Sequence, residues 1–128
     1  MMLNKLLIVG VALALAGSAQ AKGNAAAGKA KAGTCVGCHG PKGNSANPAW
    51  PKLAGQGEAY IAKQLADFKS GARKDPVMGS QATGLSKQDM ADLGAYFEQQ
   101  TISPGSAKKA KVTLGQNIYR GGNKDKGV

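Results

Sequence analysis

The sequence predicts a small all-α fold with three to four main helices. Between residues 58 and 70, three apolar side chains recur at the i, i+4 and i+7 spacing of one helix face, namely Ile61, Leu65 and Phe68. A capping-box sequence, Ser86-Lys87-Gln88-Asp89, marks the start of another helix. No segment shows the alternation of apolar and polar residues that is typical of a half-buried strand, so no sheet is expected.

Residues 1–21 are typical of a secretory signal peptide that is cleaved. Lys5 supplies the positive charge, residues 6–16 form an unbroken apolar or glycine run, and Ala19-Gln20-Ala21 has the small-residue pattern of a cleavage site. The run is shorter than the roughly 20 apolar residues needed to cross a bilayer, and no second run follows it. We therefore expect an exported chain that begins at Lys22 and has no transmembrane anchor after cleavage.

The first expected helix follows Asn24, a good N-cap residue, and runs from Ala25 to about Thr34. From residue 40 to residue 57, repeated glycines and prolines mark a long loop. Loops of this length are uncommon in compact domains unless they serve a function. The first helix therefore leads into a segment that is expected to wrap around a bound group.

The later helices are bounded by local signals. The helix at 58–70 is expected to end at Gly71, and a second loop with Gly and Pro residues is expected over 71–85. The capping-box helix is expected to run to about Gln100. It should bury three apolar side chains, Met90, Leu93 and Phe97.

The chain has two cysteines, Cys35 and Cys38, and one histidine, His39, all within one five-residue segment. Paired cysteines are the default in an exported protein, but a bridge between residues three apart would constrain little of the unfolded chain. A zinc site would need four ligands, and a thioredoxin-like dithiol would need an adjoining βαβ pattern that the sequence lacks. Cys-Val-Gly-Cys-His is the attachment pattern of a c-type haem, and a CxxC disulfide is the remaining alternative.

Haem attachment would make Cys35 and Cys38 the thioether sites of one haem c and His39 an axial ligand of its iron. Because the chain has only six aromatic residues, a covalent haem would also supply core that a domain of this size lacks. The inner face of the 58–70 helix, with Leu65 and Phe68, is expected to line the haem.

The sixth iron ligand is expected to be Met, Lys or absent, because the chain has no histidine besides His39. Met90 lies on the apolar stripe of the capping-box helix, where a core side chain is the ordinary interpretation. Met78 lies in the expected loop between Asp75 and Gly79, where packing in a helix core does not explain an apolar side chain. Met78 is therefore favoured as the distal ligand.

Two filled axial positions keep small substrates from the iron, which favours electron transfer over catalysis. On this interpretation the protein is not an enzyme, has no catalytic residue, and cycles its iron between the ferrous and ferric states. The alternative is a haem enzyme or gas-binding sensor with an open sixth coordination position.

Four stretches of the chain together form a specific pattern: Gly33–Pro41, Pro51–Gln56, Gln64-Leu65 with Phe68–Arg73, and Met78 ahead of Leu85-Ser86. They resemble the class I cytochromes c, and more closely the N-terminal haem domain of the periplasmic dihaem cytochromes c of subtype four. The resemblance covers nearly all of the chain after the signal peptide.

The resemblance implies a periplasmic protein with a class I cytochrome c fold wrapped around one covalently bound haem. It implies His39 as the proximal ligand and Met78 as the distal one, with the Pro51 carbonyl accepting the His39 Nδ1 hydrogen. The N-terminal helix would cross the C-terminal helix near Gly28 and Tyr96 or Phe97. In the respiratory chain, a quinol-cytochrome c reductase would be the electron donor and a terminal oxidase the acceptor.

The formal net charge of +10 is spread unevenly along the chain. Residues 108–128 carry +5, and only +4 remains on residues 22–107. No array of aromatic residues lies among the lysines, so nucleic-acid binding is not expected. Lys42 and Lys52, near the haem motif, are expected to steer docking onto an acidic redox partner protein.

The segment after the last helix divides the chain into further parts. Residues 103–113 are expected to be a linker after a haem domain at 22–102, because Ser103-Pro104-Gly105-Ser106 is a linker signal. Residues 114–128 resemble the opening of a second haem domain, yet no second CxxCH follows, so we expect a dihaem cytochrome that is incomplete here. A disordered basic tail is the alternative, although the spacing of Leu114, Ile118 and Tyr119 is more helix-like.

Overall fold

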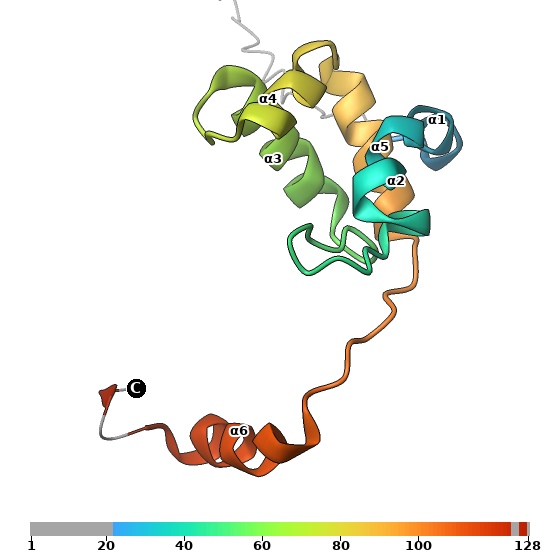
Figure 1. Ribbon diagram of the computed structural model, residues 1–128. Coiled ribbons are helices and arrows are strands. Elements are labelled where there is room, and N and C mark those ends of the chain that lie inside the picture. The colour runs from blue at the N-terminus through green and yellow to red at the C-terminus, as the bar shows by residue number, and fades with distance from the viewer. Residues whose placement is uncertain (1–21, 124–125, 128) are drawn as a thin grey trace, which may run out of the picture.

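The computed structural model describes residues 22–123 and 126–127 (Figure 1), so the predicted signal peptide lies outside the described residues. The described part has six α-helices, a short 3-10 helix and no strand. The elements are α1 (Ala25–Lys31), α2 (Gly33–His39), η1 (Pro41–Gly43), α3 (Glu58–Ser70), α4 (Pro76–Thr83), α5 (Lys87–Glu98) and α6 (Lys109–Gly121). The predicted all-α class is confirmed.

The helix expected over 25–34 is in fact two helices that meet at Ala32. Asn24 begins α1 as predicted, because its side-chain oxygen accepts hydrogen bonds from the Ala26 and Ala27 N–H groups at 2.9 and 3.1 Å. Ala32 lies between α1 and α2 and is only 2% exposed. The helix is thus interrupted at a buried residue, and the segment with the two cysteines forms a helix of its own.

The prediction of a loop over 71–85 is wrong for residues 76–83, which form α4. The Asp75 carboxylate accepts a hydrogen bond from the Met78 N–H at 2.8 Å, and Pro76 occupies the first helical position. Proline suits that position because it lacks the N–H that would have no partner there. Met78 consequently lies in the first turn of a capped helix rather than in a loop.

The bounds of α3 were predicted correctly, and the capping box of α5 is present. Gly71 ends α3 in the left-handed conformation, with φ of 78°. At the start of α5, Ser86 Oγ accepts from the Asp89 N–H, and the Asp89 carboxylate accepts from the Ser86 N–H. α5 ends at Glu98, slightly before the expected Gln100.

α1 crosses α5 at Gly28, as predicted, with the backbones in close contact. A Cβ atom at Gly28 would lie 1.9 Å from the Asp92 carbonyl oxygen and 2.9 Å from Tyr96 Cβ. On the other side of α5, a Cβ atom at Gly94 would lie 2.5 Å from the Glu58 carbonyl oxygen. Glycine therefore allows α5 to contact both α1 and α3 closely.

Substitution of Gly28 by alanine is expected to destabilise the holoprotein by about 1–3 kcal/mol, because α1 must move away from α5. Urea denaturation followed by circular dichroism measures the change in free energy of unfolding. Gly33→Ala is the matched control, since a Cβ atom at Gly33 would meet no atom within 4 Å. Equal losses in both variants would contradict the close crossing at Gly28.

The core lies where α3 and α5 meet, and α6 takes no part in it. Six residues form the buried apolar cluster: Ala32, Ile61, Leu65, Met90, Leu93 and Phe97. α6 contains the helix expected near Leu114, begins earlier at Lys109, and has no buried residue. Figure 1 shows it beyond an extended segment. Within the described ranges, no helix combines the length and apolar character needed to cross a bilayer.

Candidate haem-binding site

The cysteine motif forms the C-terminal five residues of the seven-residue helix α2. Cys35 is half-buried, Cys38 is exposed, and His39, the last residue of the helix, is 8% exposed. Burial raises the pKa of the Cys35 thiol, and a hydrogen bond with Thr34 only partly offsets this effect. A redox-active dithiol relies on a lowered thiol pKa, so the thioredoxin-like interpretation finds no support at Cys35.

The imidazole of His39 has a fixed orientation. Its Nδ1 atom lies 2.8 Å from the carbonyl oxygen of Pro51. Because a carbonyl oxygen can only accept, this contact requires the hydrogen on Nδ1 and leaves the Nε2 lone pair free to bind a metal. The contact expected from the resemblance is therefore present in the structure.

The loop that brings Pro51 to His39 is closed by hydrogen bonds between its two ends, at Gly43. The Gly43 carbonyl accepts hydrogen bonds from the Leu53 and Ala54 N–H groups at 2.8 and 3.1 Å. A Cβ atom at Gly43 would lie 2.9 Å from both Ala54 N and Phe97 Cδ1, and its φ of 76° also favours glycine. This turn holds the Pro51 segment beside α2.

The same loop is joined to the segment after α5 through Asn44. Its side-chain amide donates to the Thr101 carbonyl at 3.0 Å and accepts from the Ser103 N–H at 2.7 Å. Lys52 Nζ also donates to the Ser103 carbonyl. The supporting role of Asn44 was not predicted from the sequence, since its partners lie 57 and 59 residues away and leave no local signal.

Met78 and Met90 occupy different environments. Met78 is half-buried and packs against the apolar cluster from α4, as Cys35 does from α2. Figure 1 shows α3 and α4 on one side of the domain and α1 and α2 on the other, so the helices that carry Met78 and His39 lie apart. Met90 is 4% exposed and belongs to the buried cluster itself.

Leu65 and Phe68 are not equivalent, although both lie on α3. Leu65 is 8% exposed and is part of the apolar cluster. Phe68 is half-buried and lies outside that cluster, with the Arg73 guanidinium carbon 4.5 Å from its ring centroid. Such a cation–π contact gives a modest stabilisation to the Phe68 ring at the end of α3.

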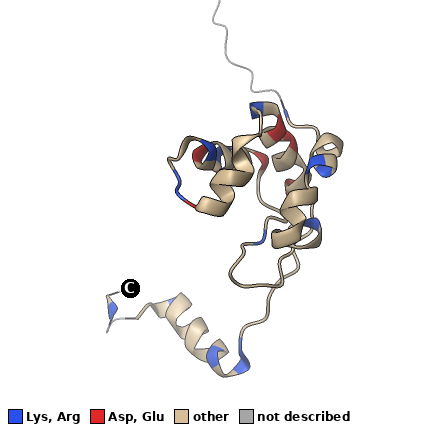
Figure 2. Ribbon diagram, turned by 45° about the horizontal axis from the view of Figure 1, so that its top comes forward, with Lys and Arg blue, Asp and Glu red and all other residues tan. Residues whose placement is uncertain are grey.

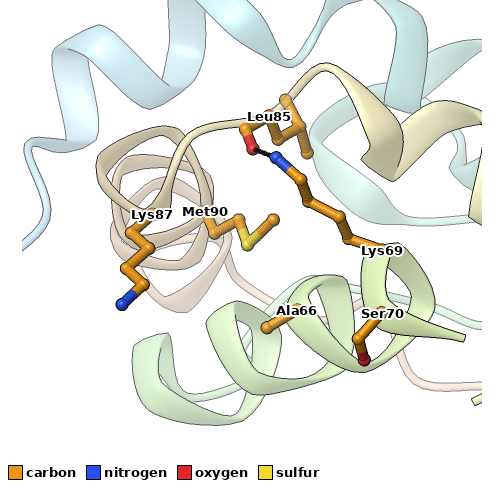
Figure 3. A pocket seen from close by; sticks show the side chains of 6 residues that line it. All are labelled: Ala66, Lys69, Ser70, Leu85, Lys87 and Met90. Carbon is orange, nitrogen blue, oxygen red and sulfur yellow. Dashed lines mark hydrogen bonds between the residues drawn. The ribbon is translucent and has the colours of Figure 1, made fainter. Parts of the chain in front are cut away.

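A cavity of about 440 Å³ lies between α3 and α5 (Figure 3). Its lining consists of Ala66, Lys69, Ser70, Leu85, Lys87 and Met90. The Lys69 ammonium donates to the Leu85 carbonyl at 2.6 Å. Cys35, Cys38 and His39 do not line this cavity, so it is separate from the residues predicted to attach haem.

Charged residues are unevenly distributed over the described residues (Figure 2). Their acidic residues lie on α3, on α5 or directly before α4, whereas α6 and Lys108 before it carry only basic charges. Lys42, next to the haem motif, is exposed and has a left-handed backbone with φ of 54°. Lys52 is half-buried and holds the Ser103 segment, so Lys42 is the more accessible of the two predicted docking lysines.

A CxxCH helix, an oriented histidine and a half-buried methionine on a small all-α scaffold define the class of c-type cytochromes. The family model described as cytochrome c matches residues 21–101, and the chain belongs to the cytochrome c family. Members of this family carry covalently bound haem c, and so does this chain.

Three relatives place the chain within the family. It is 48% identical to cytochrome c4 of Pseudomonas aeruginosa over 127 residues, which are 98% of this chain and 63% of that protein. The crystal structure of reduced cytochrome c4 from Pseudomonas stutzeri gives a TM-score of 0.74 at 43% identity, over 83% of this chain and 60% of that one. The chain is also 35% identical to the thiosulfate dehydrogenase electron acceptor of Thiomonas intermedia over 108 residues, which are 80% of this chain and 49% of that protein.

These comparisons confirm the predicted resemblance to cytochrome c of subtype four and the class I cytochrome fold. The chain spans less than two thirds of the length of the cytochromes c4 that it matches.

Proposed function

We propose that this chain is an exported electron carrier, with Cys35 and Cys38 holding haem c and with His39 and Met78 as the axial iron ligands. The observation that carries the proposal is the 2.8 Å contact between His39 Nδ1 and the Pro51 carbonyl. It leaves one ring nitrogen, Nε2, as the donor to a metal, and such a partner also raises the basicity of the ligand. When bound, haem c supplies a one-electron couple between ferrous and ferric iron.

The protein residues have distinct parts in this proposal. The two thiols lie three residues apart on one helical turn, so both can reach the edge of one macrocycle. The Asp75 carboxylate caps α4 and fixes the backbone of Met78. From this position the Met78 thioether would bind the iron. Leu65 and Phe68 are proposed to line the haem, and the apolar cluster around Leu65 keeps water away. A thioether ligand favours ferrous iron and raises the reduction potential.

A second candidate function is a haem enzyme or gas-binding sensor with an open sixth position. If Met78 ligates the iron, no position is left for a substrate, and the chain acts as a carrier and not as an enzyme. Partial burial of Met78 against the apolar cluster supports the carrier.

Carbon monoxide is expected to leave the visible spectrum of the reduced holoprotein unchanged at neutral pH, because Met78 fills the sixth position. Absorption spectroscopy with and without the gas is the measurement. Met78→Ala is the matched control and should bind carbon monoxide through the vacated position. A spectral change in the unsubstituted protein would support the haem enzyme or sensor instead.

The partners and location are proposed from charge and family. The positive balance near the haem motif, with Lys42 exposed, supports docking onto an acidic redox partner in the periplasm. A quinol-cytochrome c reductase as donor and a terminal oxidase as acceptor fit this role. Redox enzymes of the periplasm fit it too, since one relative is named an electron acceptor of thiosulfate dehydrogenase.

The domain division is also a proposal, with a signal peptide at 1–21, a haem domain at 22–102, a linker at 103–113, and the opening of a second haem domain at 114–128. Residues 109–113 of that linker are helical in the structure, because α6 begins at Lys109. The hydrogen bonds of Asn44 to Thr101 and Ser103 support a boundary there, because they hold the chain on the haem domain up to Ser103. The exposed apolar side chains of α6, including Leu114 and Tyr119, support a further module as their packing partner.

A further inference from the structure

The first described residues lie against α3 and α5 through two carboxylates. The Gly23 N–H donates to Glu58 Oε1 at 2.7 Å, and the Asn24 N–H donates to Asp92 Oδ1 at 2.8 Å. Glu58 is the first residue of α3, whereas Asp92 lies in the middle of α5. Two helices distant in the sequence therefore bind the same short backbone segment.

Gly23 brings this segment into close contact with α5. A Cβ atom at Gly23 would lie 2.1 Å from the Ala91 carbonyl oxygen and 2.4 Å from its carbonyl carbon. Both atoms belong to the helix backbone and cannot rotate away. The two carboxylates and this contact consequently fix Gly23, the residue directly after Lys22.

We propose that Glu58 and Asp92 form a receptor for the α-ammonium group that cleavage before Lys22 creates, so that processing itself stabilises the folded domain. Hydrolysis of the Ala21–Lys22 peptide bond by a signal peptidase adds one water molecule, leaving a carboxylate on Ala21 and an ammonium group on Lys22. The proposal rests on the predicted cleavage site.

Covalent geometry places the new charge close to the receptor. The backbone nitrogen of Lys22 is three bonds from the backbone nitrogen of Gly23, which limits their separation to roughly 3.6 Å. Since Gly23 N lies 2.7 Å from Glu58 Oε1, the Lys22 nitrogen lies within about 6 Å of this carboxylate. Before cleavage that nitrogen is a neutral amide, and after cleavage it carries a positive charge.

The surrounding charges favour an ammonium group. Hydrogen bonds and an ion pair at this corner involve Glu58 on α3, Asp89, Asp92 and Glu98 on α5, and Lys31 on α1, and Lys22 adds one basic side chain. Lys31 and Asp89 form an ion pair at 3.0 Å, and Glu98 accepts from the Glu58 N–H at 3.3 Å. Hydrogen bonds from the Asn24 N–H and the Gln88 amide lower the pKa of Asp92, so it is ionised at neutral pH. Once the Lys31–Asp89 pair is set aside, Glu58, Asp92 and Glu98 outnumber the Lys22 side chain, so the net charge at this corner is negative.

Two holoproteins made with exchanged signal peptides test the proposal, one beginning at Lys22 and one beginning at Ala19. Urea denaturation at pH 6 is expected to give the Lys22 form an unfolding equilibrium constant lower by about tenfold. A carboxylate receptor raises the pKa of the folded α-amino group above the value of about 7.7–8.0 in unfolded chains. The added stability is therefore complete below that range and is lost as the pH rises through the folded pKa, so the two forms should converge at pH 10.

Substitutions that remove a charge distinguish electrostatic stabilisation by the two carboxylates from stabilisation by packing. Glu58→Gln and Asp92→Asn keep an oxygen for the N–H groups but remove the charge, and each should shrink the difference between the two forms. Asp67→Asn is the matched control, because Asp67 lies on the same helix, pairs with Lys63, and should leave the difference unchanged. Equal stabilities at pH 6, or a difference that persists at pH 10 or in the double variant Glu58→Gln with Asp92→Asn, would overturn the proposal.

Mass spectrometry of the exported protein tests the premise separately. A mature chain beginning at Lys22 supports it, and a different first residue would overturn the cleavage site on which the receptor depends. Neither the urea comparison nor the mass measurement tests the carrier function, because both forms contain the same haem-binding residues. Failure of the receptor proposal would therefore leave the proposed carrier function standing.

Discussion

Simultaneous substitution of Cys35 and Cys38 by serine is expected to yield a chain without covalent haem and without a cooperative fold. Only two large side chains, Leu93 and Phe97, are fully buried in the described residues. So small an apolar core is a weak basis for stability in a domain of this size, and loss of the thioethers removes the haem that completes it.

Haem content by visible absorption and thermal unfolding by far-ultraviolet circular dichroism measure the two effects. The single variant Cys38→Ser retains one thiol for attachment and is the control for the loss of both. A double variant that is colourless but unfolds cooperatively would show that the fold does not depend on haem.

Replacement of Met78 by alanine is expected to abolish the sulfur-to-iron charge-transfer band and to lower the reduction potential. Alanine removes the soft donor that favours ferrous iron, and the open position is then available to water or to added ligands. Absorption spectroscopy of the ferric protein and a potentiometric titration give the two readouts.

The matched variant is Met90→Leu, in which another methionine of the described chain is replaced at nearly constant volume. Met90 is 4% exposed within the apolar cluster, so this change is expected to cost less than about 1.5 kcal/mol and to leave band and potential in place. Loss of the band in Met90→Leu instead would exchange the assignments of the two methionines.

Local signals in the sequence were sufficient for α3 and α5. The apolar spacing and Gly71 define α3, and the capping box begins α5, because each signal depends on residues within one or two turns. The break between α1 and α2 was not predicted, since it accompanies burial of Ala32 among residues far away in the sequence.

α4 shows how one dipeptide supports two interpretations. Asp75-Pro76 between glycine-bearing stretches suggested a loop, but aspartate at the N-cap followed by proline at the first position is also a helix start. The haem motif was evident because Cys35, Cys38 and His39 are contiguous. Support for that site from Gly43 and Asn44 depends on contacts across the fold, and no local pattern reveals such contacts.

The attachment of the chain at Asn44 restricts how far the following segment can travel. Only five residues, 104–108, separate the anchored Ser103 from the first residue of α6. At about 3.3–3.6 Å per residue, the start of α6 stays within roughly 20 Å of that anchor. A module of the same chain that includes α6 would then face the haem domain at a local concentration in the millimolar range. The frequency of encounters between the two would be set by the linker and would not fall when the protein is diluted.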